Sequence, residues 1–206
     1  LSFTASEGIQ APTCTIKDGA DATMDNSVTA TEGSSNAWTC VVSTHDNDAD
    51  GAVTFSIAFS DDADNAGTAV TATTDSSSVT IDNTHPTLTS VSIADAGTGN
   101  ANDGDDITLS FTASEGIQAP TCTINDGAGA TMDNSVTATE GSSNAWTCVV
   151  ETHDNDASGT VTFSIAFSDD ADNAGTAVAA VTDSSSVTID NVHPTLSSVS
   201  IVTAGT

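Results

Sequence analysis

The sequence of 206 residues contains one Lys and no Arg against 29 Asp and Glu, so its formal net charge is −28. Binding to nucleic-acid phosphates requires clustered basic side chains, and so does binding to an anionic membrane surface. Lys17 is the only basic side chain apart from four histidines. The composition therefore excludes nucleic acid as a partner and argues against an anionic membrane surface.

Long apolar runs are also absent from the sequence. A membrane-spanning helix needs roughly 18 or more consecutive apolar residues, whereas the stretch VTFSIAF at residues 53–59 is interrupted by Thr54 and Ser56. No membrane span is expected in this segment, and no signal peptide or anchor is recognisable. Because the chain begins at Leu1 rather than Met, we expect a processed product or a part of a longer chain.

The pattern of apolar residues predicts strands and no helices. The acids lie in short clusters, and between them Val, Ile, Phe and Thr alternate with a period of two, which is typical of half-buried strands. A disordered acidic tail would lack this alternation. We therefore expect a folded, all-β chain.

An internal repeat determines the domain organisation. The segment LSFTASEGIQAPTCTI at residues 1–16 returns unchanged at residues 109–124, which gives a period of 108 residues without a gap. Residues 1–98 differ from residues 109–206 at 11 positions. This period is too long for a solenoid turn or a propeller blade and suits an independent domain of about 100 residues.

About seven strands are expected in one complete period, and three of them carry rows of alternating apolar residues. Such rows predict one core between two sheets, and hence tandem immunoglobulin-like β-sandwiches. The expected strands are residues 87–93, 107–113, 121–124, 135–139, 145–151, 160–167 and 185–190. The rows are Ile107, Leu109, Phe111 and Ala113; Trp146, Cys148 and Val150; and Val161, Phe163, Ile165 and Phe167.

The repeat is offset from the expected domain boundaries. We assign residues 1–85 to a repeat that lacks its first strand, 86–193 to a complete repeat, and 194–206 to the first strand of a further repeat. Two explanations fit this frame: the sequence belongs to a longer array, or each chain donates its last strand to the open domain of the next chain. In both, the partners are copies of the same module in a fibre.

The four cysteines predict one disulfide in each repeat. Cys14 and Cys40 recur as Cys122 and Cys148, on inward-pointing strand positions. The alternative is a pair of buried free thiols. A zinc or thioredoxin-like site is not expected, because neither pair has the spacing CxxC. Disulfides would place the protein in an oxidising compartment outside the cytosol.

Clusters of acidic residues are the candidate metal ligands, and Ca²⁺ is the expected ion. The motif D-x-D-x-D-G at residues 46–51 has the spacing that turns alternate carboxylates toward a hard cation. It is not an EF-hand, because Ile57 occupies the twelfth position and strands flank the loop. The alternative is that Asp and Asn suit turns and keep the protein soluble. The candidate ligands are Asp46, Asp48, Asp50, Asp61, Asp62, Asp64, Asp103, Asp105, Asp154, Asp156, Asp169, Asp170 and Asp172.

One of these clusters includes Asp103 and Asp105 and is expected near the interdomain linker at residues 82–86. Calcium held between consecutive domains would stiffen a string of domains that is otherwise hinged.

Catalytic residues are not expected, since His45 and His153 lie beside acids without a nucleophile motif such as G-x-S-x-G.

Three motifs carry a resemblance to a known family: D-x-x-x-N-A-G at residues 61–67, D-N-T-x-P-T at 82–87 and T-L-S-F-T-A-S-E at 108–115. They resemble the tandem immunoglobulin-like repeats of giant bacterial surface adhesins. The resemblance implies a passive extender at the cell surface, sometimes stiffened by calcium, with no enzymatic activity. The alternatives are a pilus-like subunit that polymerises by donor-strand exchange and an adhesion module that binds a sugar or protein.

Overall fold

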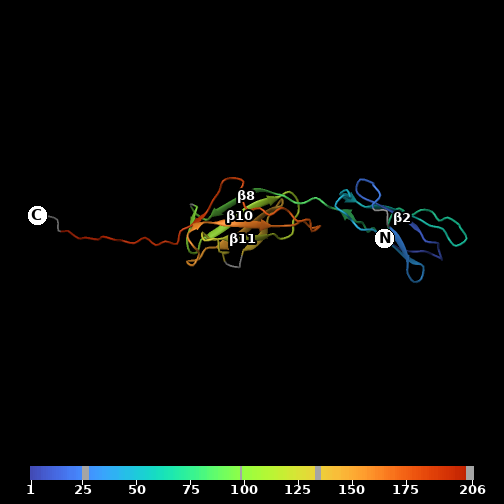
Figure 1. Ribbon diagram of the computed structural model, residues 1–206, viewed down its shortest axis with the longest axis horizontal. Helices are drawn as coiled ribbons and strands as arrows, with labels where there is room; N and C mark the ends of the chain where they lie inside the picture. Colours follow the sequence, from blue (N-terminus) through green and yellow to red (C-terminus); the bar gives the residue numbers. More distant parts are fainter. Residues whose placement is uncertain (25–27, 98, 133–135, 203–206) are drawn as a thin grey trace. The chain divides into compact units, whose positions relative to one another are not determined.

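The computed structural model describes residues 1–24, 28–97, 99–132 and 136–202. The chain divides into two compact units, Leu1–Thr84 and His85–Thr206, here called unit 1 and unit 2. Both consist of strands joined by loops (Figure 1). Within the described ranges, no helix is long and apolar enough to cross a membrane.

The larger sheet of unit 2 contains four antiparallel strands in the order β12-β13-β10-β8. These strands are β12 (Thr137–Glu140), β13 (Ala145–Glu151), β10 (Asp106–Ala113) and β8 (Leu88–Asp95). Along β10, buried residues alternate with half-exposed ones from Ile107 onward. This alternation follows from the opposite directions of successive side chains in a strand.

The other strands of unit 2 form shorter pairings. Strand β11 (Thr121–Asn125) is antiparallel to β15 (Thr162–Ala166). A three-stranded sheet joins β14 (Gly159–Thr160) to β16 (Thr188–Ile189) and β16 in parallel to β9 (Asn100–Ala101).

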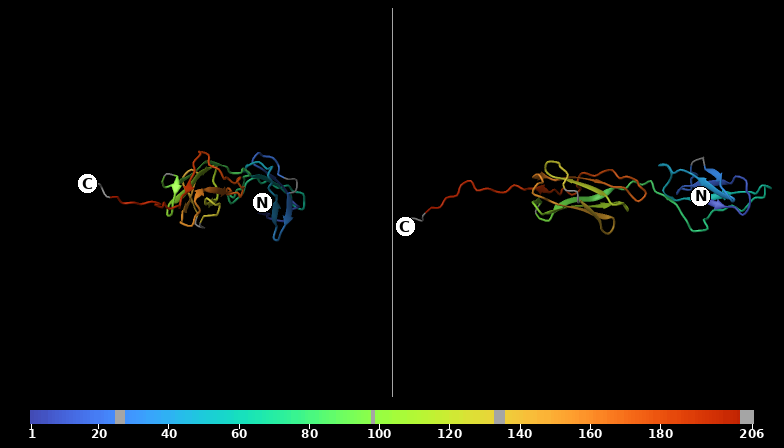
Figure 2. Two further views of the ribbon diagram at one scale, coloured as in Figure 1. Left: turned by 60° about the vertical axis from the view of Figure 1, so that its left-hand side comes forward. Right: turned by 90° about the horizontal axis from the view of Figure 1, so that it is seen from below.

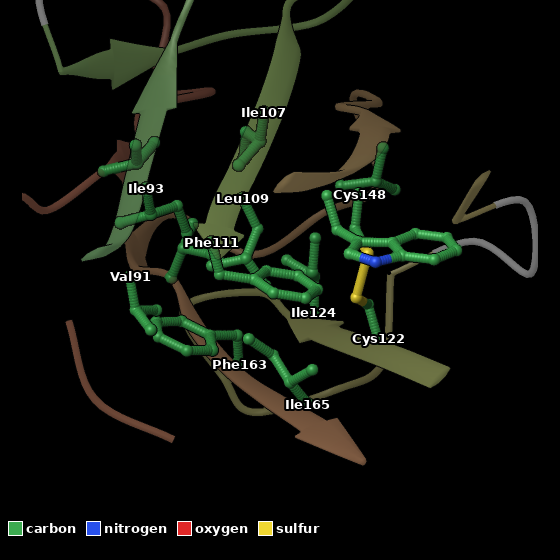
Figure 3. Packing of buried hydrophobic residues seen from close by; sticks show 14 of the residues in the cluster. Val91, Ile93, Ile107, Leu109, Phe111, Cys122, Ile124, Cys148, Phe163 and Ile165 are labelled. Atoms are coloured by element: carbon green, nitrogen blue, oxygen red, sulfur yellow. A yellow bond between two sulfur atoms is a disulfide. The ribbon is translucent and has the colours of Figure 1, made fainter. Parts of the chain in front are cut away.

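One hydrophobic core lies between these sheets (Figure 3). It contains the three rows of residues predicted from the alternation, all of which are buried. It also contains Val91 and Ile93 from β8, together with Val187 from the segment before β16. The unit is therefore an immunoglobulin-like β-sandwich, as the sequence predicts.

Unit 1 repeats this arrangement with fewer strands (Figure 2). Its sheets have the orders β1-β4-β3, β2-β6 and β5-β7. Residues 1–84 contain no counterpart of residues 88–107, so unit 1 has no equivalent of β8 or β9. The strands are β1 (Ser2–Thr4), β2 (Thr13–Lys17), β3 (Thr29–Glu32), β4 (Ala37–Val41), β5 (Gly51–Ala52), β6 (Thr54–Ala58) and β7 (Thr80–Ile81).

The strand predicted at residues 160–167 is divided in the structure. Strand β14 pairs with β16, whereas β15 pairs with β11, so the chain changes its pairing partner at Val161. The amide of Val161 donates a hydrogen bond to the carbonyl of Val187 at 3.0 Å, and in unit 1 the amide of Val53 donates to the carbonyl of Val79 at 2.9 Å. The predicted strand at 135–139 begins outside the described residues, and the structure has β12 at Thr137–Glu140.

Candidate functional site

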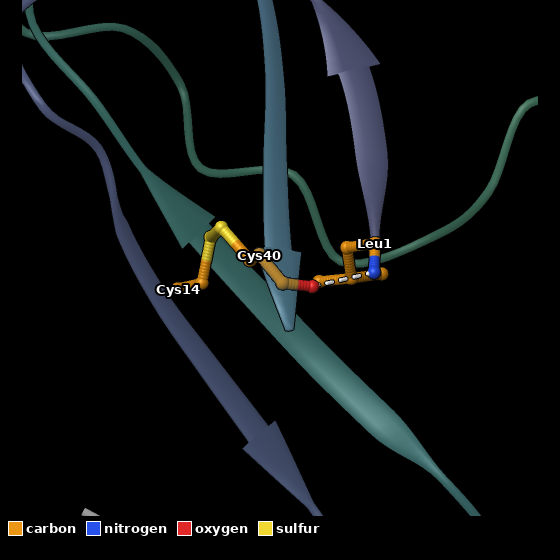
Figure 4. The surroundings of a disulfide bond; sticks show 3 residues. All are labelled: Leu1, Cys14 and Cys40. Atoms are coloured by element: carbon orange, nitrogen blue, oxygen red, sulfur yellow. Dashed lines mark hydrogen bonds between the residues drawn. A yellow bond between two sulfur atoms is a disulfide. The ribbon is translucent and has the colours of Figure 1, made fainter. Parts of the chain in front are cut away.

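Each unit contains one disulfide, with the pairing that the sequence predicts. Cys14 is bonded to Cys40 in unit 1 (Figure 4), and Cys122 to Cys148 in unit 2. The second bond joins β11 to β13 and therefore links the two layers of the sandwich through the core (Figure 3). Disulfides persist in oxidising environments.

The loop that follows β15 uses its acids to hold its own backbone. The carboxylate of Asp169, which is 2% exposed, accepts hydrogen bonds from the amides of Ala171 and Asn173 at 2.9 and 2.8 Å. Its second oxygen accepts the Asn173 side-chain amide at 2.9 Å. Burial acts to raise the pKa of Asp169, but these bonds and nearby His85 together lower it. Asp61 makes the same bonds in unit 1.

Two other acids of this cluster also lie within the loop. Asp172 accepts a hydrogen bond from the side chain of Gln118 at 2.8 Å, and Asp64 accepts one from Gln10 at 2.9 Å. The neighbouring side chains of Asp62 and Asp170 are exposed. Of the predicted ligands in this loop, these last two are the most accessible to an ion from solvent.

The loop with the motif D-x-D-x-D-G is tied to the segment that follows β7. Asp48 accepts the amide of His45 at 2.7 Å, and Asp50 accepts the amide of Asn83 at 2.6 Å. Asp50 also accepts the hydroxyl of Thr84. The hydroxyl and the amide lower the pKa of Asp50. The carboxylate of Asp48 thus holds its own loop, that of Asp50 joins the loop to the segment after β7, and Asp46 is exposed.

The glycine of this motif has a packing role. Gly51 has a φ of 132°, a region that residues with a Cβ rarely adopt. A Cβ on Gly19, in the facing loop, would lie 2.0 Å from the carbonyl oxygen of Asp50. The motif therefore requires glycine because two backbones meet closely, which is a reason independent of any ion.

Unit 2 brings together acids from two clusters that are distant in sequence. Asp103 accepts the amide of Asp154 at 3.0 Å. Asp105 accepts the amide of Asn102 at 2.9 Å, and Asp156 accepts the amide of His153 at 2.7 Å. Sequence spacing did not predict that these clusters meet.

His85 belongs to the predicted linker at residues 82–86. Its ring contacts the carbonyl of Ala174 at 2.9 Å, beside the Asp169 loop.

Asp126 is a buried aspartate that the sequence pattern did not indicate, and it accepts hydrogen bonds from three backbone amides. Asp126 accepts the amides of Ala128 and Ala130 through one oxygen and that of Ala157 through the other, at 2.8–3.0 Å. Asp18 does the same in unit 1. The available signal was the dipeptide Asp-Gly directly after a strand, which is typical of turns.

These bonds predict an acid-sensitive contribution to stability. The amides of Ala157 and Ala130 lower the pKa of Asp126 from its usual 3.8, against the effect of burial. A carboxyl group whose pKa is lower in the folded state stabilises the fold at pH values above its unfolded pKa. This stabilisation is lost as the pH falls through the folded pKa.

We expect Asp126→Asn to be less stable than the parent at pH 7, because one amide nitrogen of Asn would face the donor of Ala157. The stability of the variant should then fall less steeply below about pH 4. Urea unfolding between pH 2.5 and 7 measures both effects. Asp170→Asn, which removes the same charge at an exposed site, is the control and should keep the parent's pH profile. Identical profiles for all three proteins would contradict this role of Asp126.

Unit 1 has an apolar groove where unit 2 has β8. The groove has a volume of about 520 Å³. Val79 is 62% exposed, whereas its counterpart Val187 is 0% exposed under β8. The apolar lining of the groove includes Leu1, Phe3, Val53, Phe55, Ile57 and Val79.

Comparisons with known proteins identify no family for this chain. No family model matches it, and no curated protein matches it. Among solved structures, it is similar to the titin Ig tandem domains A164-A165 at 14% identity, with a TM-score of 0.27, covering 87% of this chain and 82% of that one. It is also similar to the titin domains Z1Z2 in complex with telethonin at 11% identity, with a TM-score of 0.28, covering 86% and 80%.

Proposed function

We propose that this chain is a structural repeat module of an extracellular filament or cell-surface stalk, without enzymatic activity. The observation that carries the proposal is the tandem of two disulfide-bonded sandwiches built from copies of one repeat, in which residues 1–98 differ from residues 109–206 at only 11 positions. Such repetition suits a protein whose task is to cover distance. The resemblance to bacterial adhesin repeats supports the same function.

The hydrogen bonds of the loops support a structural role. Asp61, Asp126 and Asp169 each engage both carboxylate oxygens in contacts with their own or a facing loop. A catalytic carboxylate must instead reach a substrate. The acidic surface keeps such a module soluble at high local concentration.

Localisation on the source cells tests this proposal. An antibody raised against unit 2 should label filaments or the cell surface in immunogold electron microscopy of intact cells. Detergent-permeabilised cells serve as the control for internal protein. Label that is seen only after permeabilisation would contradict the proposed location.

We also propose that Ca²⁺ binds to the acidic loops and stiffens the module. In unit 2, Asp103 and Asp154 come from different loops and lie side by side, which supports these loops as the place of binding. A net charge of −28 adds an attraction for cations that salt screens. Extracellular calcium modules bind with dissociation constants of the order of 1 mM.

We expect 10 mM Ca²⁺ to stabilise the protein by about 1.4 kcal/mol for each site of 1 mM affinity, because a ligand stabilises the state that binds it. Thermal unfolding in Ca²⁺, in Mg²⁺ and in NaCl of equal ionic strength measures this effect. The NaCl sample isolates general screening of the acids. An equal increase of the melting temperature in all three salts would refute specific calcium binding.

A further inference from the structure

The segment that leaves unit 1 is held by the carboxylate of Asp50. Strand β7 ends at Ile81, and Asp82, Asn83 and Thr84 follow it. One oxygen of Asp50 accepts the amide of Asn83 at 2.6 Å, and the other accepts the hydroxyl of Thr84. Both carboxylate oxygens are thus used to hold two successive residues of this segment.

The side chain of Asn83 forms a further contact, which both units share. Its amide nitrogen donates to the carbonyls of His45 and Asp48 at 3.1 and 2.9 Å. In unit 2, the side chain of Asn191 donates to the two equivalent carbonyls at 2.9 and 3.0 Å. This asparagine therefore docks the segment on the neighbouring loop in the same way in each unit.

Unit 2 lacks the carboxylate and the hydroxyl of unit 1. Ser158 stands in the place of Asp50, and Val192 in the place of Thr84. The amide of Asn191 donates to the hydroxyl oxygen of Ser158 at 3.0 Å. A valine side chain has no donor, so the second of the two bonds cannot form. The segment that leaves unit 2 is therefore held by one neutral hydrogen bond where unit 1 has two bonds to a charged group.

Four of the 11 differences between the repeats fall in two pairs of contacting residues. One pair is Asp50 with Thr84, and the other is Lys17 with Asp21, which form an ion pair at 3.0 Å. Unit 2 has uncharged residues in place of all four. At these places the repeats differ by a whole contact, because both of its members are replaced together.

The chain is held again as soon as it enters unit 2. The ring of His85 contacts the carbonyl of Ala174 at 2.9 Å, and the side chain of Pro86 is fully buried. The amide of Thr87 donates to the hydroxyl oxygen of Ser114 at 3.0 Å, and its carbonyl accepts the amide of Ser114 at 2.9 Å. The order of the connecting residues therefore depends on how unit 1 holds its last ones.

We propose that Asp50 and Thr84 form a latch that fixes the segment leaving unit 1, and that Ser158 and Val192 leave the corresponding segment of unit 2 looser. Two positions of a repeat then determine how stiff the joint after that repeat is. This inference rests on the structural role proposed above. The latch needs no ion, so its test and the tests of location and of calcium binding can fail separately.

Hydrogen exchange at the Asn83 amide tests the latch. We expect the double substitution Asp50→Ser, Thr84→Val to increase the exchange rate of this amide by about fivefold, because a bond to a charged group is replaced by one to a hydroxyl. NMR on the full chain in EDTA measures the rate without calcium. Asp46→Ser is the matched control: it removes the same charge from an exposed site in the same loop and should leave the rate nearly unchanged.

The single variants test whether the two residues act as one contact. Thr84→Val should increase the exchange rate in the parent chain but should add nothing in an Asp50→Ser background, because the hydroxyl then has no carboxylate to bond. The heteronuclear NOE of residues 82–84 should fall in every variant that opens the latch. This NOE reports the motion of the backbone itself, which a purely local change of charge would not affect.

The reverse exchange tests the inference in unit 2. Ser158→Asp with Val192→Thr should slow the exchange of the Asn191 amide by a similar factor, because it supplies both members of the latch. This variant adds a contact, so its result does not depend on the stability of unit 1.

Three results would overturn the proposal. The first is an unchanged exchange rate and NOE in the Asp50→Ser, Thr84→Val chain. The second is an equal increase in the rate in Asp46→Ser, which would assign the effect to charge alone. The third is a strictly additive effect of the two single substitutions, which would show that Asp50 and Thr84 do not act through each other.

Discussion

Replacement of both Cys122 and Cys148 by Ala is expected to lower the free energy of unfolding of unit 2 by about 3.5 kcal/mol. The bond closes a loop between residues 26 positions apart, and in the chain-entropy model such a cross-link restricts the unfolded chain to this extent. Cys148 is fully buried, so the lost sulfur contacts add to the effect.

Each unit contains one tryptophan, which makes the measurement selective. In a Trp38→Phe background, the fluorescence of Trp146 reports urea unfolding of unit 2 alone. The control replaces Cys14 and Cys40 by Ala, which should leave the unit 2 transition unchanged. A loss below about 1 kcal/mol in the unit 2 variant would show that the disulfide adds little to the stability of this core.

Phe111→Ala is expected to destabilise unit 2 by about 3–5 kcal/mol, as large-to-small substitutions in closed cores do. Phe111 is 2% exposed and lies opposite Trp146 across the β10–β13 ladder. The surrounding strands prevent the sandwich from collapsing into the space that the ring leaves.

Phe3→Ala is the matched comparison, because Phe3 occupies the same repeat position and lines the open groove. We expect Phe3→Ala to lower the free energy of unfolding of unit 1 by clearly less than Phe111→Ala lowers that of unit 2, since the phenyl ring of Phe3 is only half-buried. Unfolding followed by Trp38 in a Trp146→Phe background measures this loss. Equal losses at both positions would mean that the groove of unit 1 is closed in solution.

Alternation predicted the long strands of the complete repeat well. The strand at 145–151 has the predicted bounds, and that at 107–113 differs by one residue, because both carry an unbroken row of core side chains. Strand β9 was not predicted. It has two residues, and its parallel pairing with β16 depends on a contact between distant parts of the chain.

The roles of the acidic residues were less predictable. A motif such as D-x-D-x-D-G specifies that carboxylates gather in a turn, but not whether amides or an ion face them. In the structure, Asp48 and Asp50 face amides. The role of Asp126 was missed for a related reason. Its carboxylate accepts the amide of Ala157, which is 31 residues away, and local spacing does not reveal such a contact.

The disulfide between Cys122 and Cys148 also determines how unit 2 responds to a pulling force along the chain. When a sandwich without cross-links is pulled apart, all of its residues become extended. Here the 26 residue steps between the two cysteines cannot lengthen while the bond is intact, which withholds about 90 Å of extension. A unit that breaks under load would therefore yield a shorter tether, and its strands would remain closer together for refolding.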